Sequence, residues 1–159
     1  MRRSRDKFPK AITGSPPPAA VIPIVSKTVL FLDDERSYVD LMVQLLSENL
    51  NCRVIGHTKP HEALAVLPQL DAAVIVTDYH MPLMNGIDFL HRAHAICPDT
   101  AAIMITGHQI ELADEDLTRV PGLRATLFKP LGWRALADNI LMHWPDLNPP
   151  MLREDLYRP

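Results

Sequence analysis

Four apolar segments, far apart in the chain, each run directly into polar residues, and this pattern constrains the fold most. They are Leu30–Leu32 before Asp33-Asp34, Val74–Thr77 before Asp78, Ile103–Ile105 before Thr106, and Leu127-Phe128 before Lys129-Pro130. Buried parallel strands have such continuous apolar runs, because helices cover both faces of their sheet. In an open α/β sheet the ligand site lies at the carboxyl ends of the strands. The pattern therefore predicts that three carboxylates, a hydroxyl and an ammonium meet at one edge of one sheet.

The stretches between these runs carry apolar residues at helical spacing, so strands and helices alternate along the chain. Strands are predicted over 28–32, 52–56, 72–77, 101–105 and 124–128, and helices over 36–50, 61–67, 86–96, 111–120 and 133–144. The helix over 111–120 is weak and acidic, and Pro121-Gly122 ends it. Five such units with parallel strands imply an α/β, doubly wound sheet with right-handed crossovers and helices on both faces.

The length of 159 residues fits one domain with a tail at each end. Residues 1–26 combine a basic start with a proline-rich stretch and are predicted to be a flexible arm. The domain is predicted over 27–145 and a short C-terminal tail over 146–159. An apolar content of 47% excludes a wholly disordered chain, and the net charge of −3 does not favour nucleic-acid binding.

The sequence gives no signal for a membrane span, a signal peptide or a cysteine–histidine metal site. Neither Cys52 nor Cys97 has metal-ligand spacing. His91 and His94 lie one helical turn apart, but no third ligand is evident, so partly exposed helix residues are the favoured interpretation. We therefore expect a cytoplasmic protein with reduced thiols and no contact with a membrane.

The predicted polar cluster suits Mg²⁺-assisted phosphoryl transfer to a carboxylate. Three clustered carboxylates repel one another, so a cation is expected to balance them. Hard oxygen ligands beside a phosphate favour Mg²⁺. A carboxylate is a possible nucleophile toward phosphorus, and the equatorial phosphoryl oxygens then need positive charge and hydrogen bonds around them. Lys129 and Mg²⁺ are expected to supply the charge, and Thr106 a hydrogen bond.

With these motifs in place, residues 27–144 resemble the receiver domain of bacterial two-component response regulators. The matching motifs, in the family's order and spacing, are Leu32–Glu35, Thr77–Gly86, Ile105–Gly107 and Phe128–Pro130. One such motif is weak, whereas four together are specific. The resemblance covers about three quarters of the chain and implies the flavodoxin-like strand order 2-1-3-4-5.

The resemblance also implies a role for each matching position. Asp78 corresponds to the phosphoacceptor, which is also a metal ligand. Asp34 and Asp33 correspond to the acidic pair that holds Mg²⁺, Asp34 directly and Asp33 largely through water. The backbone carbonyl of His80 corresponds to the family's main-chain metal ligand.

Three further positions follow from the same resemblance. Thr106 corresponds to the switch hydroxyl and Lys129 to the phosphate-binding lysine. The Lys129–Pro130 bond is implied to be cis, which is reasonable because an X–Pro bond lowers the cost of that isomer.

The chain departs from the family pattern near the site. Thr126 stands where the family usually has the Tyr or Phe whose ring turns inward on activation. Phe128 is no simple substitute, because a residue next to Lys129 points to the other face of the strand. His80 and His108 occupy positions that flank the phosphoryl group and tune its lifetime in the family, so we expect them to affect dephosphorylation.

These residues also have plainer interpretations. Asp33 and Asp34 alone would be read as helix caps, and Thr106-Gly107 as a strand end with a turn. An aspartate-nucleophile phosphohydrolase would need a second aspartate two residues after the nucleophile. Glu35 and His80 occupy those positions, which weighs against an enzyme with substrate turnover.

The leading functional hypothesis is a stand-alone phosphoacceptor of a phosphorelay. A sensor histidine kinase or a histidine phosphotransfer protein would phosphorylate Asp78, and a downstream protein would bind the face formed by 111–144. No DNA-binding domain follows residue 145, so direct DNA binding is not expected, and homodimerisation stays open. The second hypothesis is a pseudo-receiver scaffold that is never phosphorylated, which the missing aromatic at Thr126 keeps open.

Overall fold

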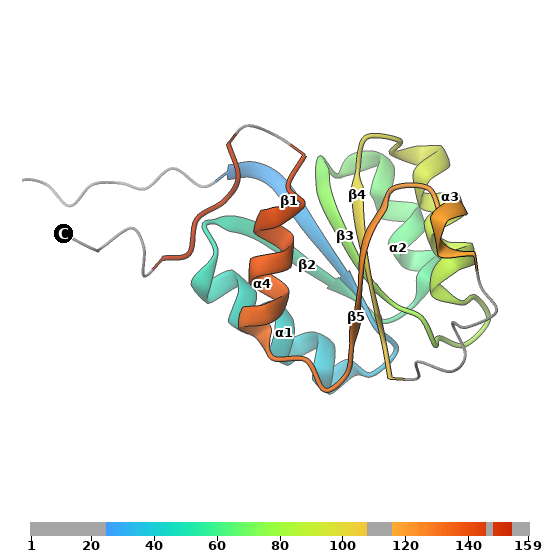
Figure 1. Ribbon diagram of the computed structural model, residues 1–159, viewed down its shortest axis with the longest axis horizontal. Helices are drawn as coiled ribbons and strands as arrows, with labels where there is room; N and C mark the ends of the chain where they lie inside the picture. The colour runs from blue at the N-terminus through green and yellow to red at the C-terminus, as the bar shows by residue number, and fades with distance from the viewer. Residues whose placement is uncertain (1–24, 108–115, 146–147, 154–159) are drawn as a thin grey trace, which may run out of the picture.

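The fold is a five-stranded parallel sheet with helices on both faces (Figure 1). A computed structural model of the chain describes residues 25–107, 116–145 and 148–153. The strands are β1 (Val25–Leu32), β2 (Cys52–His57), β3 (Ala72–Asp78), β4 (Ala101–Thr106) and β5 (Leu123–Phe128). Their order is β2-β1-β3-β4-β5. The predicted fold class and strand order are confirmed.

Two of the three central strands, β3 and β4, are buried along their whole length. Every residue of β3 and of β4 is buried, as expected for strands covered on both faces. β2 and β5 are the edge strands of the sheet, and β5 is only partly buried. β1 begins at Val25 and pairs there with Cys52, so its start lies inside the arm predicted over 1–26.

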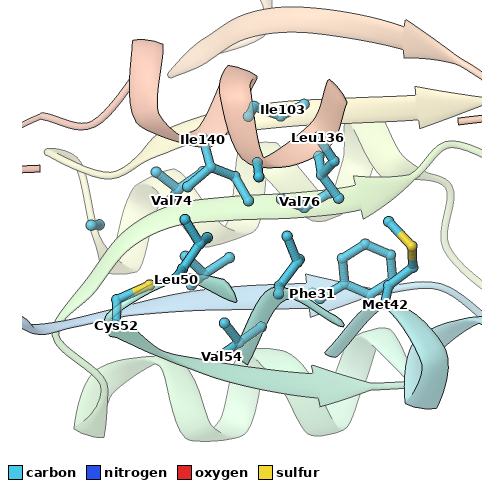
Figure 2. Close-up of a cluster of buried hydrophobic side chains, with 14 of the residues drawn as sticks. Phe31, Met42, Leu50, Cys52, Val54, Val74, Val76, Ile103, Leu136 and Ile140 are labelled. Atoms are coloured by element: carbon cyan, nitrogen blue, oxygen red, sulfur yellow. The ribbon is translucent and has the colours of Figure 1, made fainter. Parts of the chain in front are cut away.

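One face of the sheet is covered by α1 (Arg36–Asn49) and α4 (Trp133–Met142) (Figure 1). Figure 2 shows the core between them and the sheet, where side chains of α1 and α4 meet those of β1, β3 and β4. Its largest fully buried members include Phe31, Met42 and Leu46. Burying apolar surface is the main stabilising contribution to such a fold, so this layer fixes β1 and β3 relative to α1.

The other face is covered by α2 (Pro60–Val66), the 3₁₀ turn η1 (Leu67–Gln69) and α3 (Gly86–Ile96) (Figure 1). A second cluster, which includes Leu30, Ile75 and Phe89, packs there. α3 is capped at its N-terminus by Asn85, whose side chain accepts a hydrogen bond from the Asp88 backbone N–H at 2.9 Å. No helix within the described residues is long and apolar enough to cross a membrane.

The weak helix predicted over 111–120 is not an α-helix in its described part. Residues 111–115 lie outside the described residues, and Leu117–Arg119 forms a single 3₁₀ turn, η3. Asp116 competes for local hydrogen bonds, since its carboxylate pairs with Arg119 at 2.8 Å and its backbone carbonyl accepts from the Arg119 N–H. Gly122 then turns the chain into β5 with a φ of 75°, a value that favours glycine.

The C-terminal residues 148–153, predicted to be part of a tail, pack against the domain. Leu152 forms an antiparallel bridge with Leu50, and the Arg153 N–H donates to the Asn49 carbonyl at 2.8 Å. Leu152 is only 7% exposed and belongs to the core under α1 and α4. α4 itself ends at Met142 rather than at Trp144, although the Trp144 side chain is still buried. The segment thus closes the end of the core beyond α4.

Candidate functional site

An ion-paired triad lies at the carboxyl edge of the sheet. Lys129 Nζ lies 2.7 Å from Asp33 Oδ2 and 2.8 Å from Asp78 Oδ1. Asp33 follows β1, Asp78 ends β3 and Lys129 follows β5, so parallel strands bring together residues up to 96 positions apart. Of the five groups predicted to meet at this edge, the Asp33 and Asp78 carboxylates and the Lys129 ammonium are in direct contact.

The two carboxylates of the triad are buried. Asp33 is 1% exposed and Asp78 is 5% exposed. Burial raises the pKa of the Asp78 carboxyl and the charge of Asp33 adds to this, while Lys129 and the His80 backbone N–H act in the opposite direction. The pKa stays raised, because the effect of burial on the charged form is the largest of these.

Lys129 is held firmly in its charged form. Burial lowers the pKa of its ammonium, but the hydrogen bonds to Asp33 and Asp78 outweigh that effect and raise the pKa to about 12. Its backbone N–H also donates to the Thr106 carbonyl at 2.8 Å. The Lys129–Pro130 peptide bond is cis. The lysine is therefore fixed by its main chain and by both carboxylates.

Asp33 and Asp34 have different environments despite being neighbours. Asp33 Oδ1 accepts a hydrogen bond from the Glu35 N–H at 2.9 Å, which orients the start of α1. Helix capping is therefore a small part of its role, because Oδ2 binds Lys129. Asp34 is exposed and lines an open pocket of about 610 Å³ together with Pro60, Pro82 and others.

Thr106 ends β4 beside the triad and is fully buried. In the sheet register Asp78 pairs with Ile105, and Thr106 pairs with Phe128. The Thr106 side chain therefore stands on the strand between Asp78 and Lys129. Asp78, Lys129 and the end of β4 form one continuous edge.

The loop after Asp78 folds back so that Gly86 lies against the backbone of Asp78 and Tyr79. The Gly86 N–H donates to the Tyr79 carbonyl at 2.8 Å, and a Cβ at Gly86 would lie 2.5 Å from the Asp78 carbonyl oxygen. Only glycine fits this close approach. His80 is exposed in the loop, and its ring packs edge-to-face on Tyr79 with 4.9 Å between centroids. His108, the other predicted tuning residue, lies outside the described residues.

Thr126, the atypical position, lies on β5 three residues before Lys129 of the triad. It is partly buried on β5 and lines a pocket of about 230 Å³ with Leu117 and Leu123. Phe128 is 42% exposed and is not one of the residues that line this pocket.

Sequence reasoning missed one residue of the site, Tyr38 of α1. Lys129 Nζ lies 5.0 Å from the centroid of the Tyr38 ring, within the range of a cation–π contact. The signal that could have found it was positional, since Tyr38 lies in the first turn of α1, the helix that follows Asp33 and Asp34.

The donor chemistry of the site fits a small hard cation, although its arrangement here is not a formed metal site. Asp33, Asp34 and Asp78 all offer carboxylate oxygens, and the triad carries one negative charge more than Lys129 balances. No group of three metal-ligating side chains is clustered within the described residues. Asp34 is exposed, and Lys129 binds one oxygen of Asp33 and one of Asp78.

The amino-acid sequence matches one family model over residues 29–141, the response regulator receiver domain. The chain belongs to the response regulator receiver domain family. Among curated relatives, this receiver is 32% identical over 111 residues to a response regulator receiver protein of Anaeromyxobacter. It is 30% identical over 105 residues to the uncharacterized transcriptional regulatory protein YesN of Bacillus subtilis. These alignments cover 69% and 64% of the chain, but only 45% and 28% of the two relatives.

Solved structures show the same fold. A CheY-like receiver domain protein of Methanospirillum hungatei superposes on this receiver with a TM-score of 0.64 at 28% identity, covering 73% of this chain and 91% of that one. The chemotaxis protein CheY4 of Vibrio cholerae gives a TM-score of 0.66 at 23% identity, covering 75% and 99%. The second likeness concerns the fold alone. Family membership places the chain in two-component signalling.

Proposed function

We propose that this receiver accepts a phosphoryl group on Asp78 from a phosphohistidine of a sensor histidine kinase or a histidine phosphotransfer protein. The observation that carries the proposal is the buried triad, in which one ammonium bridges Asp78 and Asp33 at 2.8 and 2.7 Å. A structural ion pair needs only one carboxylate, and burying a second carboxylate lowers stability. The second buried carboxylate therefore supports a functional role. Perturbed carboxyl pKa values of this kind cluster at functional sites.

The proposed reaction uses Asp78 as the nucleophile. One carboxylate oxygen attacks phosphorus, the bond to the donor's imidazole nitrogen breaks, and that nitrogen keeps the electron pair. Lys129 is proposed to exchange its contact with Asp78 for one with a phosphoryl oxygen, because its ammonium lies beside the attacking carboxylate. Thr106, at the end of the neighbouring strand, is proposed to donate a hydrogen bond to another phosphoryl oxygen.

Mg²⁺ is proposed as the cofactor, held by Asp33, Asp34, Asp78 and the His80 carbonyl. When bound, it would neutralise phosphoryl oxygens and offset the excess negative charge of the acidic residues. Asp34 is exposed at the mouth of the site, so rotating its side chain toward the metal would cost little free energy. His80 is exposed beside Asp78, and we propose that it tunes hydrolysis of the acyl phosphate together with His108.

Downstream, the phosphorylated form is proposed to change its affinity for a protein that binds the face over 111–144. We propose a cytoplasmic location, which the two free cysteines favour. Substrate turnover of the kind a phosphohydrolase shows is not part of the proposal, so para-nitrophenyl phosphate is expected to stay intact.

The test is phosphorylation by acetyl phosphate followed by intact-protein mass spectrometry. With Mg²⁺ present, the chain is expected to gain the mass of one phosphoryl group, and EDTA is expected to suppress the gain. Lys129→Ala should slow the reaction strongly, since it leaves Asp33 and Asp78 without a counter-ion. A chain that gains no mass under any of these conditions would support the pseudo-receiver scaffold instead.

A further inference from the structure

The ammonium of Lys129 has one side that neither carboxylate occupies. A lysine ammonium offers three N–H donors, and two of them serve Asp33 and Asp78. The ring of Tyr38 stands 5.0 Å from the nitrogen, measured to the ring centroid. The side chain of Lys129 is 30% exposed. The Tyr38 ring and the two carboxylates together limit where its ammonium can move.

The ring of Tyr38 is itself fixed in place. It meets Phe31 edge-to-face, with 5.8 Å between centroids and 61° between planes. Phe31 is fully buried in β1, two residues before Asp33. Phe31 therefore links the ring that faces the ammonium to the strand that leads into Asp33.

The hydroxyl of Tyr38 has no visible role in holding the ring or the ammonium. Its oxygen is buried and has no hydrogen-bond partner among the described residues. Burial raises the pKa of the phenol, so the group is neutral and is no counter-ion for Lys129. A buried hydroxyl without a hydrogen-bond partner lowers stability. The contribution of Tyr38 to the site therefore comes from its ring.

We propose that Tyr38 is a positioning residue for Lys129, and that it acts through the face of its ring rather than through its hydroxyl. The inference rests on the proposed function, because the lysine is positioned there for phosphoryl transfer to Asp78. During transfer Lys129 must leave the Asp78 oxygen and bind a phosphoryl oxygen. A cation–π contact is weakly directional, so the ring keeps the ammonium close while letting it shift.

The test compares a variant that keeps the ring with variants that remove it. Tyr38→Leu and Tyr38→Met are expected to slow phosphorylation by acetyl phosphate by about 2- to 30-fold, the range of a partly desolvated cation–π contact. Tyr38→Phe is expected to restore the rate to within about twofold of the wild type. If Tyr38→Phe is as slow as the ringless variants, the hydroxyl is the active group and the proposal is wrong.

A double-mutant cycle separates positioning from general destabilisation. If Tyr38 acts through Lys129, Tyr38→Leu should have no further effect on the rate in a Lys129→Ala background. Val39→Ala removes buried volume at the neighbouring position of the same helix and is the matched control, with an unchanged rate expected while the protein is folded. Equal slowing in both backgrounds, or by Val39→Ala, would overturn the proposal.

A measurement that needs no phosphorylation keeps the two proposals apart. The Lys129 ammonium proton resonance should be shifted upfield by the ring in the wild type and in Tyr38→Phe, but not in Tyr38→Leu. An upfield shift in a protein that acetyl phosphate does not modify would contradict the proposed function alone. Identical ammonium shifts in wild type and Tyr38→Leu would contradict the positioning role alone.

Discussion

At the scale of single residues, the balance of charge around Lys129 decides how the site behaves. One ammonium serves two carboxylates that are almost fully buried. The raised pKa of Asp78 means that folding favours its protonated form. The ionised Asp78 carboxylate therefore lowers the stability of the protein. This loss of stability is present when the pH is above the pKa of Asp78 in the folded state.

Replacing Asp78 by Asn should stabilise the protein at neutral pH. The substitution removes a buried charge while Lys129 keeps its contact with Asp33. The stability gain should fade as the pH falls through the raised pKa of Asp78 toward its ordinary value of 3.8, because the wild-type carboxyl is then protonated as well. Urea unfolding at pH 7 and near pH 4 measures the difference. A less stable Asp78→Asn at pH 7 would show that the Lys129 pair outweighs burial.

At the scale of elements, the segment over 148–153 packs against the end of α1 and the turn into β2. Leu152 bridges Leu50 and fills the end of the core below α4. Its neighbour Met151 is 46% exposed, and its backbone carbonyl accepts the Asn51 N–H at 3.3 Å. Adjacent residues thus have opposite environments, one buried and one facing solvent.

Leu152→Ala should lower the free energy of unfolding by about 2–3 kcal/mol, since it removes a nearly buried side chain and leaves a cavity. Met151→Ala keeps the same backbone contacts and should change stability by less than about 0.5 kcal/mol. Urea unfolding of both variants at equal protein concentration measures the difference. Equal and small effects would show that the segment does not contribute to the core.

The sequence was informative for elements whose pattern is local. The apolar runs of β3 and β4 predicted buried strands, and the residues after them predicted where Asp78 and Thr106 lie. Docking of Leu152 was not predictable, because a contact with Leu50 depends on tertiary packing about 100 residues away. The 3₁₀ turn at Leu117–Arg119 was missed because Asp116 and Arg119 form local pairs that hydrophobic spacing does not reveal.

The same reasoning applies to the candidate site. Asp33, Asp78 and Lys129 were predictable, because each ends a strand and parallel strands align their ends. The exposed orientation of Asp34 and the ring contact from Tyr38 depend on side-chain directions, which spacing alone does not determine.

At the scale of the whole molecule, the proposed switch runs from Asp78 through Thr106 toward β5. The Thr106 carbonyl accepts the Lys129 N–H at 2.8 Å, and the Tyr79 N–H donates to Ile105 at the same distance. A shift of Thr106 toward a phosphoryl group would therefore move main-chain atoms on both neighbouring strands. Ligand-driven changes of this kind shift the population of two pre-existing states.

Amide NMR with beryllofluoride and Mg²⁺ should detect that change. Chemical-shift changes are expected to extend beyond the site through 116–130. Thr106→Ala should weaken them, whereas Thr126→Ala should not, because Thr126 is too small to fill and leave a pocket as an aromatic ring would. Changes confined to residues next to Asp78 would argue for a scaffold without a switch.

The measurement that tests the central claim most directly is the location of the phosphoryl group. After reaction with acetyl phosphate and Mg²⁺, borohydride reduces an acyl phosphate, and peptide mass spectrometry then identifies the reduced residue. Our account predicts a single reduced residue at Asp78 in the wild type and none in Asp78→Asn. Reduction at another residue, or equal modification of Asp78→Asn, would contradict it.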